Sequence, residues 1–547
     1  MSKIFYRLQM KDGRDGETVT DHMLSINRIT AHEDYGGEEF VNLKKGDIVI
    51  VQKSAYPVAM VIVQDKIAED LLDEKSLGVD FSVEILSWFK DIDKKDAEIA
   101  SLWGYFPFTK TFSSLNSGNS TYTKVLRWYN ILISSKMINE LTDLLSFKFQ
   151  IILQGPPGTG KTYTAKDIAE SMICGSVSAD KEIQKTNLVK SDQYSLIQFH
   201  PSYSYEDFVR GITAKSNGNS IEYKTVNKRL CELADKANKN LVDSKKPSEQ
   251  LSKERWLDEK FLLFVNSVIG QIESKGKIKL TEGKSIDSVD EEEDRFVSGQ
   301  NYYLYFNQIK KLYLYNIDSQ KELEGNENFQ AHVKWRTSYY FPILHKFRSF
   351  LNGENPPSSG EIKVEKRNYV LILDEINRAN LPSVLGELIY ALEYRDEPVD
   401  GMYEIEGERE LVLPSNLFII GTMNTADRSV GHIDYAIRRR FAFVHVPPSA
   451  NVIDEVIKDT SLNAKAKALY NAVENLFMEK NTDNETYTYL SSDFKPEEVQ
   501  LGHSYFLADS EEHLKLKLEY EIKPILDEYL KDGILLGTAK PIIDGLS

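Results

Sequence analysis

The residues best suited to chemistry form a glycine-rich loop after a short apolar run. Ile151 to Leu153 lead into Gly155-Pro156-Pro157-Gly158-Thr159-Gly160-Lys161-Thr162, and a helix-forming segment, Tyr163 to Met172, follows. A loop of this pattern between a strand and a helix is typical of phosphate binding. Its glycines allow backbone angles closed to other residues, so successive N–H groups can turn toward a polyphosphate. We therefore expect the loop to bind a nucleotide, rather than to be a surface turn.

Two side chains of this loop have specific tasks in such a site. Lys161 can bring a positive charge to the β and γ phosphates, and Thr162 can offer its hydroxyl to Mg²⁺. The helix that follows points its N-terminus at the anion, where the helix dipole favours negative charge.

A second apolar run, Tyr369 to Leu373, ends in the carboxylates Asp374 and Glu375. Beside a phosphate-binding loop, the first acid holds the Mg²⁺ shell and the second polarises the attacking water. The alternative is a buried strand that merely leaves the core through an acidic turn. Because the loop and the acidic pair occur in one chain, the sequence predicts a nucleoside triphosphatase whose Mg²⁺ is held by Thr162 and Asp374.

A third apolar run, Leu417 to Met423, ends in Asn424. An amide at the end of a neighbouring strand can reach the γ-phosphate or the hydrolytic water. Farther along, Arg438, Arg439 and Arg440 stand in a row. Arginines at such a place can neutralise charge on the nucleotide of an adjacent subunit, so the site would be completed between copies of the chain.

Four segments together make the chain similar to the McrB family of AAA+ motor subunits from modification-dependent restriction systems. They are Phe199 to Phe208, Asp374 to Asn380, Met423 to Ser429 and Gly502 to Phe506. The resemblance covers about residues 136–530 apart from an insertion, and Asn424-Thr425-Ala426-Asp427 is its most specific part. It implies an α/β AAA+ core of the phosphate-loop type with a helical C-terminal lid.

The resemblance also implies roles for single residues. Asn424 and Asp427 would organise the catalytic water together with Glu375, and Arg428 would join an intersubunit network. Either Arg439 or Arg440 would act in trans, and the sequence does not choose between them. Asp427 and Arg428 could instead pair simply to hold a loop.

The partners and the nucleotide follow from the resemblance alone. It implies a homohexameric ring, hydrolysis stimulated by a separate McrC-like nuclease subunit, and an N-terminal domain that recognises DNA. It also implies GTP, but the loop and Asn424 contact only phosphates, so ATP remains an alternative. Two rival functions stay open: a MoxR-like chaperone that remodels protein complexes without a nuclease, and a binding scaffold in which hydrolysis is only a timer.

Positioning these residues requires several domains. We expect a β-rich N-terminal domain over residues 1–115, a linker over 116–135, the α/β core over 136–446 and a helical lid over 447–547. A mostly helical insertion of the core is expected over about 236–362, with a solvated loop at its acidic run, Asp290 to Asp294. That run could alternatively bind a basic partner.

The N-terminal domain should contain a hairpin from Asp47–Val51 and Val58–Val63, and a third strand over Phe81–Trp88. The hairpin is similar to barrels of the PUA or EVE type, which flip modified bases. Aromatic residues are dense between Trp88 and Phe108, namely Trp88, Trp103, Tyr105, Phe106 and Phe108. They could stack on bases, but filling the domain core is the favoured interpretation.

Nuclease chemistry is not expected in this chain. The triplets Glu361-Ile362-Lys363 and Glu521-Ile522-Lys523 fit the Glu-x-Lys pattern of restriction nucleases, but such triplets arise by chance in a chain rich in Glu and Lys. The second also lies within a helical pattern of the lid, where Pro524 could kink or restart the helix.

Bulk properties restrict the remaining classes. The 547 residues carry a formal net charge of −17, so any DNA contact should be confined to a local basic patch. Cys174 and Cys231 are the only cysteines, too few for a disulfide framework. The sequence shows neither a signal-peptide core nor an apolar run of membrane-spanning length, and we expect a soluble, cytoplasmic protein.

Overall fold

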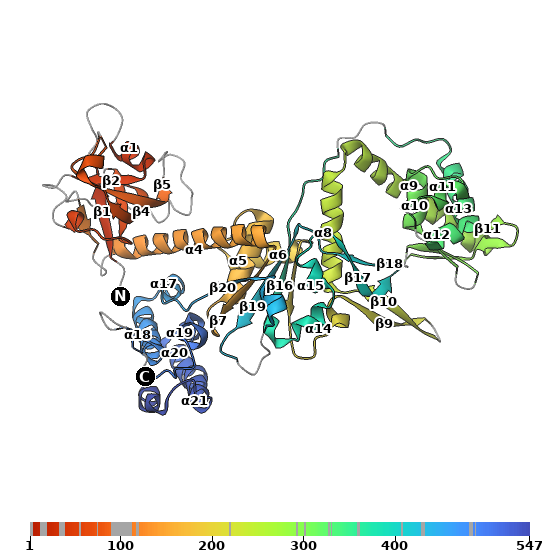
Figure 1. The fold of residues 1–547 in the computed structure, drawn as a ribbon. Helices are drawn as coiled ribbons and strands as arrows, with labels where there is room; N and C mark the ends of the chain where they lie inside the picture. The colour runs from red at the N-terminus through yellow and green to blue at the C-terminus, as the bar shows by residue number, and fades with distance from the viewer. Residues whose placement is uncertain are drawn as a thin grey trace.

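The structure is a computed structural model with an α/β core at its centre, an N-terminal β domain, a helical lid and an insertion that forms a separate lobe (Figure 1). It describes residues 4–10, 19–31, 39–53, 56–73, 75–88, 112–115, 120–217, 220–291, 294–299, 302–326, 329, 331–357, 362–405, 408–427, 433–480, 485–486 and 488–547. No helix among them is both long enough and apolar enough to cross a bilayer.

The N-terminal domain is a six-stranded mixed sheet, with strand order β2-β5-β4-β3-β1-β6. Its strands are β1 (Phe5–Gln9), β2 (Arg28–Ala31), β3 (Ile48–Lys53), β4 (Tyr56–Lys66), β5 (Val79–Trp88) and β6 (Phe112–Ser114), and helix α1 (Val19–Ser25) packs beside them. The predicted hairpin is β3 and β4, and the predicted third strand is β5. β1 and β3 pair in parallel, whereas every other described pair is antiparallel.

The sheet curls into a half-barrel, which is part of the barrel that the hairpin resembled. Strands β2 and β6 stand at opposite ends of the strand order and do not pair among the described residues. Trp88 ends β5 and packs against the domain's apolar core, as the core interpretation expects. Trp103, Tyr105, Phe106 and Phe108 lie outside the described residues.

Most of the segment predicted to be a linker, residues 116–135, is instead helical. Helix α4 (Ser120–Lys148) runs without a break from the N-terminal domain to the core, so residues 120–135 are helical. Val125 and Trp128 of α4 are buried against Phe5 and Met60 of the N-terminal sheet. Burial of these side chains explains why this stretch is a helix, although its sequence starts with linker-like residues.

The core is built on five parallel strands in the order β20-β7-β19-β16-β8. They are β7 (Gln150–Gly155), β8 (Tyr194–Gln198), β16 (Tyr369–Asp374), β19 (Leu417–Asn424) and β20 (Ala442–His445). Successive side chains point to opposite faces: Ile152 packs into one apolar cluster, whereas Ile151 and Leu153 pack into another. Both faces are buried, so the three central strands are nearly continuous apolar runs.

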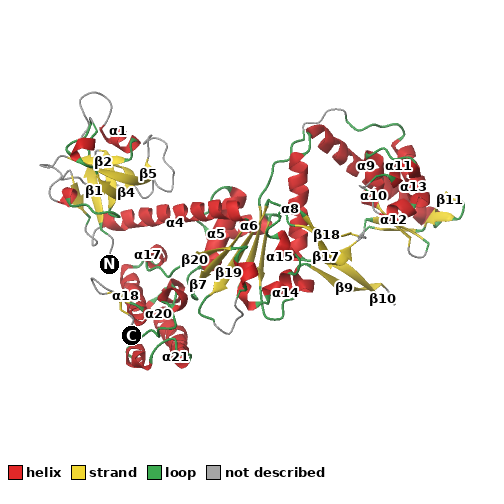
Figure 2. Ribbon diagram, in the orientation of Figure 1, coloured by secondary structure: helices red, strands yellow, loops and turns green. Residues whose placement is uncertain are grey.

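Helices cover both faces of this sheet (Figure 2). They include α5 (Lys161–Cys174), α6 (Lys181–Lys190), α8 (Arg229–Lys245), α14 (Leu381–Leu385) and α15 (Leu388–Ala391). The short helix α7 (Tyr205–Phe208) follows β8, and Ser204 and Asp207 form a capping box at its start.

Two antiparallel hairpins that the sequence did not predict project from the core. They are β9 (Arg210–Asn217) with β10 (Ser220–Asn227), and β17 (Pro398–Ile405) with β18 (Glu408–Val412). Buried Arg210 joins them, because its guanidinium donates to Asn227 Oδ1 at 2.8 Å and to the carbonyl oxygen of Arg409 at 3.1 Å.

The insertion is mostly helical, as predicted, but includes small sheets. Its helices are α9 (Ser248–Lys275), α10 (Phe306–Leu314), α11 (Gln320–Glu324), α12 (Ala331–Trp335) and α13 (Thr337–Leu351). Its strands are β11 (Ile278–Thr281), β12 (Lys284–Ile286), β13 (Ser288–Asp290), β14 (Arg295–Ser298) and β15 (Tyr302–Tyr305). A separate core rich in phenylalanine holds them together. The acidic run begins at Asp290, the last residue of β13, and Asp294 directly precedes β14, whereas Glu292 and Glu293 lie outside the described residues.

The lid is helical, as expected. Its main elements are α17 (Asn451–Val456), α18 (Thr460–Phe477), α19 (Pro496–Val499), η3 (His503–Phe506), α20 (Glu511–Lys517), η4 (Leu518–Ile522), α21 (Lys523–Lys531) and α22 (Lys540–Asp544). The segment η4 is a single π-helical stretch that ends at Ile522, two residues before Pro524. A wider turn at this point lets the helical run continue past the proline.

Candidate functional site

The glycine-rich loop lies at the carboxyl end of β7 and leads directly into α5. Gly158 and Gly160 both have φ of +79°, which only glycine adopts without strain, and Gly160 is the N-cap of α5. The Thr159 hydroxyl donates to the carbonyl oxygen of Pro156 at 3.1 Å and so closes the loop on itself. The backbone therefore has the shape that phosphate binding requires.

Asp374 lies beside this loop, as expected of a metal-holding acid. The register places Asp374 at the end of β16, next to the end of β8. Its Oδ1 accepts hydrogen bonds from the hydroxyls of Thr162 at 2.6 Å and of Thr422 at 2.7 Å. A carboxylate and a hydroxyl from neighbouring elements form an oxygen donor set that fits Mg²⁺.

Glu375 follows in a strained conformation with φ of +56°. Its backbone N–H donates to the Thr422 hydroxyl at 3.0 Å, which anchors the turn. Its carboxylate Oε2 accepts from Arg378 Nε at 2.9 Å. The side chain of Glu375 is 28 % exposed, so solvent can reach the carboxylate.

Lys161 folds over the loop. Its ammonium Nζ donates to the carbonyl oxygens of Pro156 at 2.7 Å and of Gly155 at 3.0 Å. Burial lowers the pKa of Lys161 to about 8, against the opposing effect of the Glu375 and Asp374 carboxylates. A poorly hydrated ammonium in this position gains most from an incoming anion.

Asn424 ends β19 directly opposite Gly155 of β7. Its side-chain Oδ1 accepts from the backbone N–H of Ala426 at 3.2 Å, and its carbonyl oxygen accepts from Asn377 Nδ2 at 3.2 Å. Asp427 is half-buried on the same loop. Arg428, which sequence reasoning placed in an intersubunit network, lies outside the described residues.

The lid packs directly on the glycine-rich loop. The backbone N–H of Gly502 donates to the Pro157 carbonyl oxygen at 2.9 Å, and that of Ser504 donates to the Gly158 carbonyl oxygen at 3.0 Å. A Cβ on Gly502 would lie 2.0 Å from the carbonyl carbon of Gly158. Only a glycine therefore permits this approach of two backbones.

Comparisons with known proteins agree with this arrangement. The family model for the AAA domain (dynein-related subfamily) matches residues 335–441, and the model for the McrB alpha-helical lid domain matches residues 489–534. The chain is an McrB-like AAA protein with an McrB lid. The matched segments contain Asp374, Glu375, Asn424 and the three arginines in the core, and Gly502 to Phe506 in the lid.

Two relatives of the McrB-like chain are components of restriction enzymes. It is 25 % identical over 418 residues to the type IV methyl-directed restriction enzyme EcoKMcrB subunit of Escherichia coli (strain K12), which covers 74 % of this chain and 58 % of the relative. It is 30 % identical over 168 residues to the type II restriction enzyme BsuMI component YdiS of Bacillus subtilis (strain 168), which covers 28 % of this chain and 46 % of the relative. The chain thus spans about half the length of the curated relatives that it matches.

The arginine row of this McrB-like chain divides into three environments. Arg440 is 10 % exposed at its side chain and contacts Glu393 Oε2 at 3.0 Å, with a further bond to the Ala436 carbonyl oxygen. Arg439 contacts the same carboxylate at 2.9 Å but is 64 % exposed. Arg438 is exposed and stacks over the ring of Phe443. The structure thus separates residues that the sequence left equivalent.

Sequence reasoning did not assign a role to Thr422, Arg378 or His503. Thr422 lies two residues before Asn424 on a predicted strand, and a hydroxyl there could have been recognised as a possible partner of Asp374. His503 is packed against Gly160, and its Nδ1 accepts from the Ser449 backbone N–H at 3.3 Å. Burial lowers the pKa of His503 to about 4, so its imidazole is neutral.

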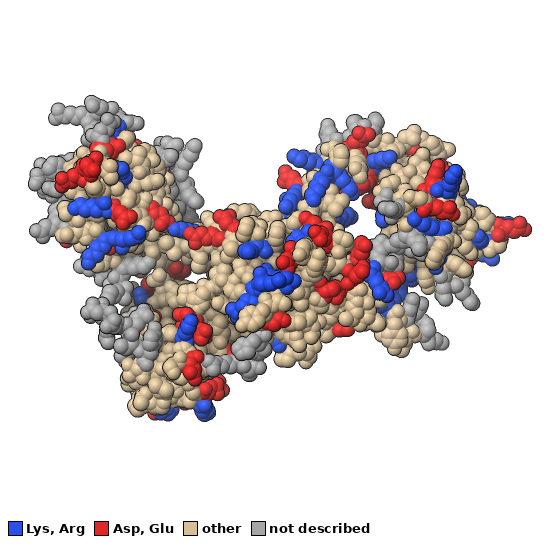
Figure 3. Space-filling view, viewed as in Figure 1, with Lys and Arg blue, Asp and Glu red and all other residues tan. Residues whose placement is uncertain are grey.

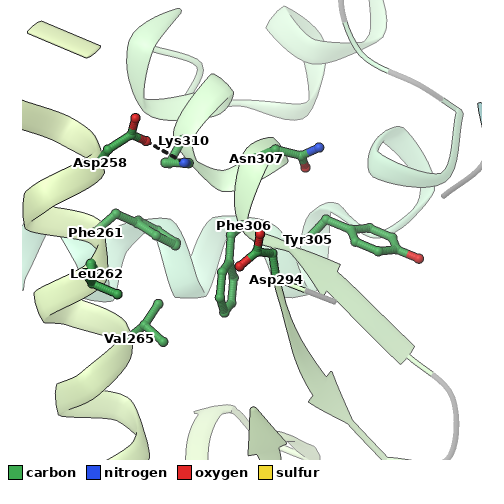
Figure 4. Close-up of a pocket in the computed structure, with 9 residues that line it drawn as sticks. All are labelled: Asp258, Phe261, Leu262, Val265, Asp294, Tyr305, Phe306, Asn307 and Lys310. Atoms are coloured by element: carbon green, nitrogen blue, oxygen red, sulfur yellow. Dashed lines mark hydrogen bonds and ion pairs between the residues drawn. The ribbon is translucent and has the colours of Figure 1, made fainter. Parts of the chain in front are cut away.

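A cleft of about 670 Å³ separates the predicted site from part of the lid. Pro157, Asn424 and Asp427 line it on the core side, and residues of α21 line it on the lid side. A second cavity, of about 300 Å³, lies in the insertion between α9 and α10, where Asp258 and Lys310 form an ion pair at 2.5 Å (Figure 4). This second cavity contains none of the residues predicted from the sequence to act on a nucleotide.

Proposed function

We propose that this McrB-like protein is a nucleoside triphosphatase that uses GTP, with ATP as the alternative substrate. The arrangement of Thr162, Asp374 and Thr422 beside the glycine-rich loop is the observation that carries this proposal. It supports a metal–triphosphate substrate, because two hydroxyls and one carboxylate converge where the loop's backbone turns. Mg²⁺ held there by Thr162 and Asp374 would neutralise phosphate charge.

In this proposal the chain's own groups orient the triphosphate and a water molecule. Backbone N–H groups of residues 155–162 bind the phosphates, and Lys161 Nζ exchanges its carbonyl partners for phosphate oxygens. Glu375 acts as the general base once its carboxylate leaves Arg378. Asn424 and Asp427, on the adjoining loop, orient the water.

We further propose that the site is completed by a second copy in a hexameric ring. Arg439 is the residue that acts in trans, because its guanidinium is exposed and can exchange Glu393 for phosphate. Arg440 instead holds α16 (Tyr435–Arg438) to the core, since its side chain is nearly buried. Arg439→Ala should abolish the stimulation of hydrolysis by neighbouring copies without changing the thermal unfolding midpoint. Arg440→Ala should instead lower that midpoint.

The larger setting of the proposal is defence against foreign DNA. The names of both relatives, a methyl-directed restriction enzyme subunit and a restriction enzyme component, support a role as one part of a multi-component system. We propose that the N-terminal domain recognises DNA and that hydrolysis drives a separate McrC-like nuclease. On the face drawn in Figure 3, acidic and basic side chains are interspersed, so DNA contact requires a small local patch.

Hydrolysis measured with GTP and with ATP, in Mg²⁺ and with chelator, tests the proposal. The expected result is GTP hydrolysis that depends on Mg²⁺ and rises when a candidate nuclease subunit and methylated DNA are added. Hydrolysis without any response to nuclease or DNA would reject the restriction role and favour a chaperone or timer. No hydrolysis of either nucleotide would reject the enzyme.

A further inference from the structure

The insertion carries three positive charges that form no ion pair with any described residue. They belong to Lys284 of β12, Lys334 of α12 and Arg336, the N-cap of α13. Each donates to a neutral oxygen, either a hydroxyl or a main-chain carbonyl. Other cations of the lobe do have acidic partners, as Lys310 and Arg348 show. In a chain with a net charge of −17, cations that are left without a carboxylate indicate an anionic partner.

Two stacked tyrosines connect these cations. The rings of Tyr302 and Tyr339 lie with their centroids 5.2 Å apart and their planes at 15°. The ammonium Nζ of Lys284 is 4.5 Å from the ring centroid of Tyr339, and the guanidinium carbon of Arg336 is 5.4 Å from that of Tyr302. Tyr302 is 45 % exposed, so the edge of this cluster faces solvent.

Trp335 adds an uncovered aromatic ring to the same surface. It lies between Lys334 and Arg336 in the sequence, and its side chain is 83 % exposed. Tryptophan is highly buried on average in native proteins, so packing within the lobe explains the tyrosine pair but not this indole. We call this set of residues the basic aromatic patch: Lys284, Tyr302, Lys334, Trp335, Arg336 and Tyr339.

The combination of charge and ring faces selects among anionic partners. Single-stranded nucleic acid has phosphates for the cations and unpaired bases that stack on aromatic side chains. A duplex keeps the faces of its bases stacked inside and offers the patch mainly its phosphates. An acidic peptide can neutralise the cations, but its carboxylates leave the indole uncovered.

We propose that the basic aromatic patch binds single-stranded DNA, with an unpaired base on Trp335 and backbone phosphates on Lys284, Lys334 and Arg336. The inference goes beyond the proposed function, which assigns DNA recognition to the N-terminal domain, and only the choice of DNA over RNA rests on that function. The insertion is then a second DNA-binding lobe, on the opposite side of the core from the N-terminal domain (Figure 1).

Binding of a labelled oligo-dT of about 15 nucleotides to the full-length chain, measured by fluorescence anisotropy without nucleotide, tests the stacked base. Trp335→Leu keeps an apolar side chain but removes the ring, so the Kd should rise by about fivefold or more. Trp335→Tyr retains a ring and should stay within about twofold of wild type. Because the indole is exposed, neither variant should change the thermal unfolding midpoint.

Charge reversal tests the phosphate contacts on the same oligonucleotide. Lys284→Glu and Lys334→Glu should each raise the Kd by about tenfold at low salt and make the Kd less dependent on salt concentration. Arg255→Glu is the matched control, because Arg255 is an exposed cation near the start of α9 that already has an acidic partner in Glu259, at 3.5 Å. This control should leave the Kd within about twofold of wild type.

Photocrosslinking with an oligonucleotide that carries 5-iodouracil locates the contact. Crosslinks to the peptide that contains Trp335 are expected, whereas crosslinks confined to the N-terminal domain would overturn the inference. Equal weakening of single-strand and duplex binding in Trp335→Leu, or competition by oligoglutamate as strong as that by unlabelled oligo-dT, would also overturn it. Tighter binding of an oligouridylate of the same length would overturn the choice of DNA.

Hydrolysis of GTP and ATP by the same wild-type samples separates this inference from the proposed function. Protein that binds the oligonucleotide through the patch but hydrolyses neither nucleotide would reject the triphosphatase and support the patch. Protein that hydrolyses nucleotide but binds oligo-dT equally well with and without the Trp335 ring would overturn the patch and leave the triphosphatase intact.

Discussion

The proposed nucleotide site and the insertion are both built around buried apolar clusters, but they use polar residues in opposite ways. At the edge of the core sheet, Asp374, Thr162 and Thr422 converge on one point, and the glycines keep the space around it free. In the insertion, charged residues pair at the surface, as Asp258 does with Lys310, over a core of phenylalanines. The difference teaches that converging polar groups signal chemistry, whereas dispersed ion pairs accompany simple packing.

The largest effect should come from the convergent site. Glu375→Gln keeps the shape of the side chain but removes the proposed general base, so the hydrolysis rate should fall by about 10²–10⁴-fold. Nucleotide affinity should remain within a few fold of wild type, which a fluorescent nucleotide titration would measure. Lys310→Ala in the insertion is the control and should leave the rate unchanged. Equal loss in both variants would contradict the contrast between the two regions.

The insertion should respond in stability instead. Phe347 is fully buried, with its ring centroid 5.0 Å from that of Phe261 and 5.3 Å from that of Phe264. Phe347→Ala should lower the free energy of unfolding of this lobe by about 3–5 kcal/mol, because a large cavity remains. Limited proteolysis and thermal unfolding measure this, with Phe350→Ala, at 39 % exposed, as the milder variant on the same helix. A change in nucleotide affinity of the folded protein would show that the two regions are coupled.

The contact between lid and loop should give a smaller effect that involves both stability and binding. A methyl group on Gly502 cannot fit against Gly158, so Gly502→Ala should separate the lid from the loop at a cost of about 1–3 kcal/mol. Nucleotide affinity should fall with it. Gly537→Ala, with no atom within 4 Å of the added methyl, is the control for the lid. If both variants behave alike, the lid does not support the loop.

The sequence predicts the convergent site better than the rest of the molecule for a physical reason. Gly158, Gly160 and Asp374 are constrained by backbone geometry and by charge, and such constraints leave a pattern in adjacent residues. The division of tasks between Arg439 and Arg440 depends on burial against Glu393, which is 46 residues from Arg439 in the sequence. The same holds for the hairpins joined by Arg210, because their partners come from distant segments.

The N-terminal half shows how packing overrides local composition. Residues after Asn116 have the composition of a linker. Helix α4 nevertheless begins at Ser120, because Val125 and Trp128 pack against the N-terminal sheet. The strands β3, β4 and β5 were predictable from their apolar runs. The open edges of that sheet, at β2 and β6, were not predictable. Whether a sheet closes depends on which strands pair with each other, and the sequence of a single strand does not determine this.

The smallest predicted effect concerns the protonation of Lys161. Burial lowers its pKa to about 8 in the free protein, and a bound polyphosphate should raise that pKa because it favours the charged ammonium. Well below pH 8 the group is protonated in both states, so affinity should not depend on it. Above pH 8 the free protein loses the proton that binding needs, so the nucleotide Kd should rise by up to about tenfold per pH unit.

Titration of a fluorescent nucleotide across about pH 6.5–9.5 measures this slope, and calorimetry in buffers of different ionisation enthalpy measures the proton uptake. Lys161→Arg is the informative control, because a guanidinium keeps its charge over the whole range. Its affinity should be weaker at neutral pH, where the shorter ammonium fits the loop better, but nearly flat above pH 8. A slope that persists in the arginine variant would assign the titration to another group and would remove Lys161's burial as the cause.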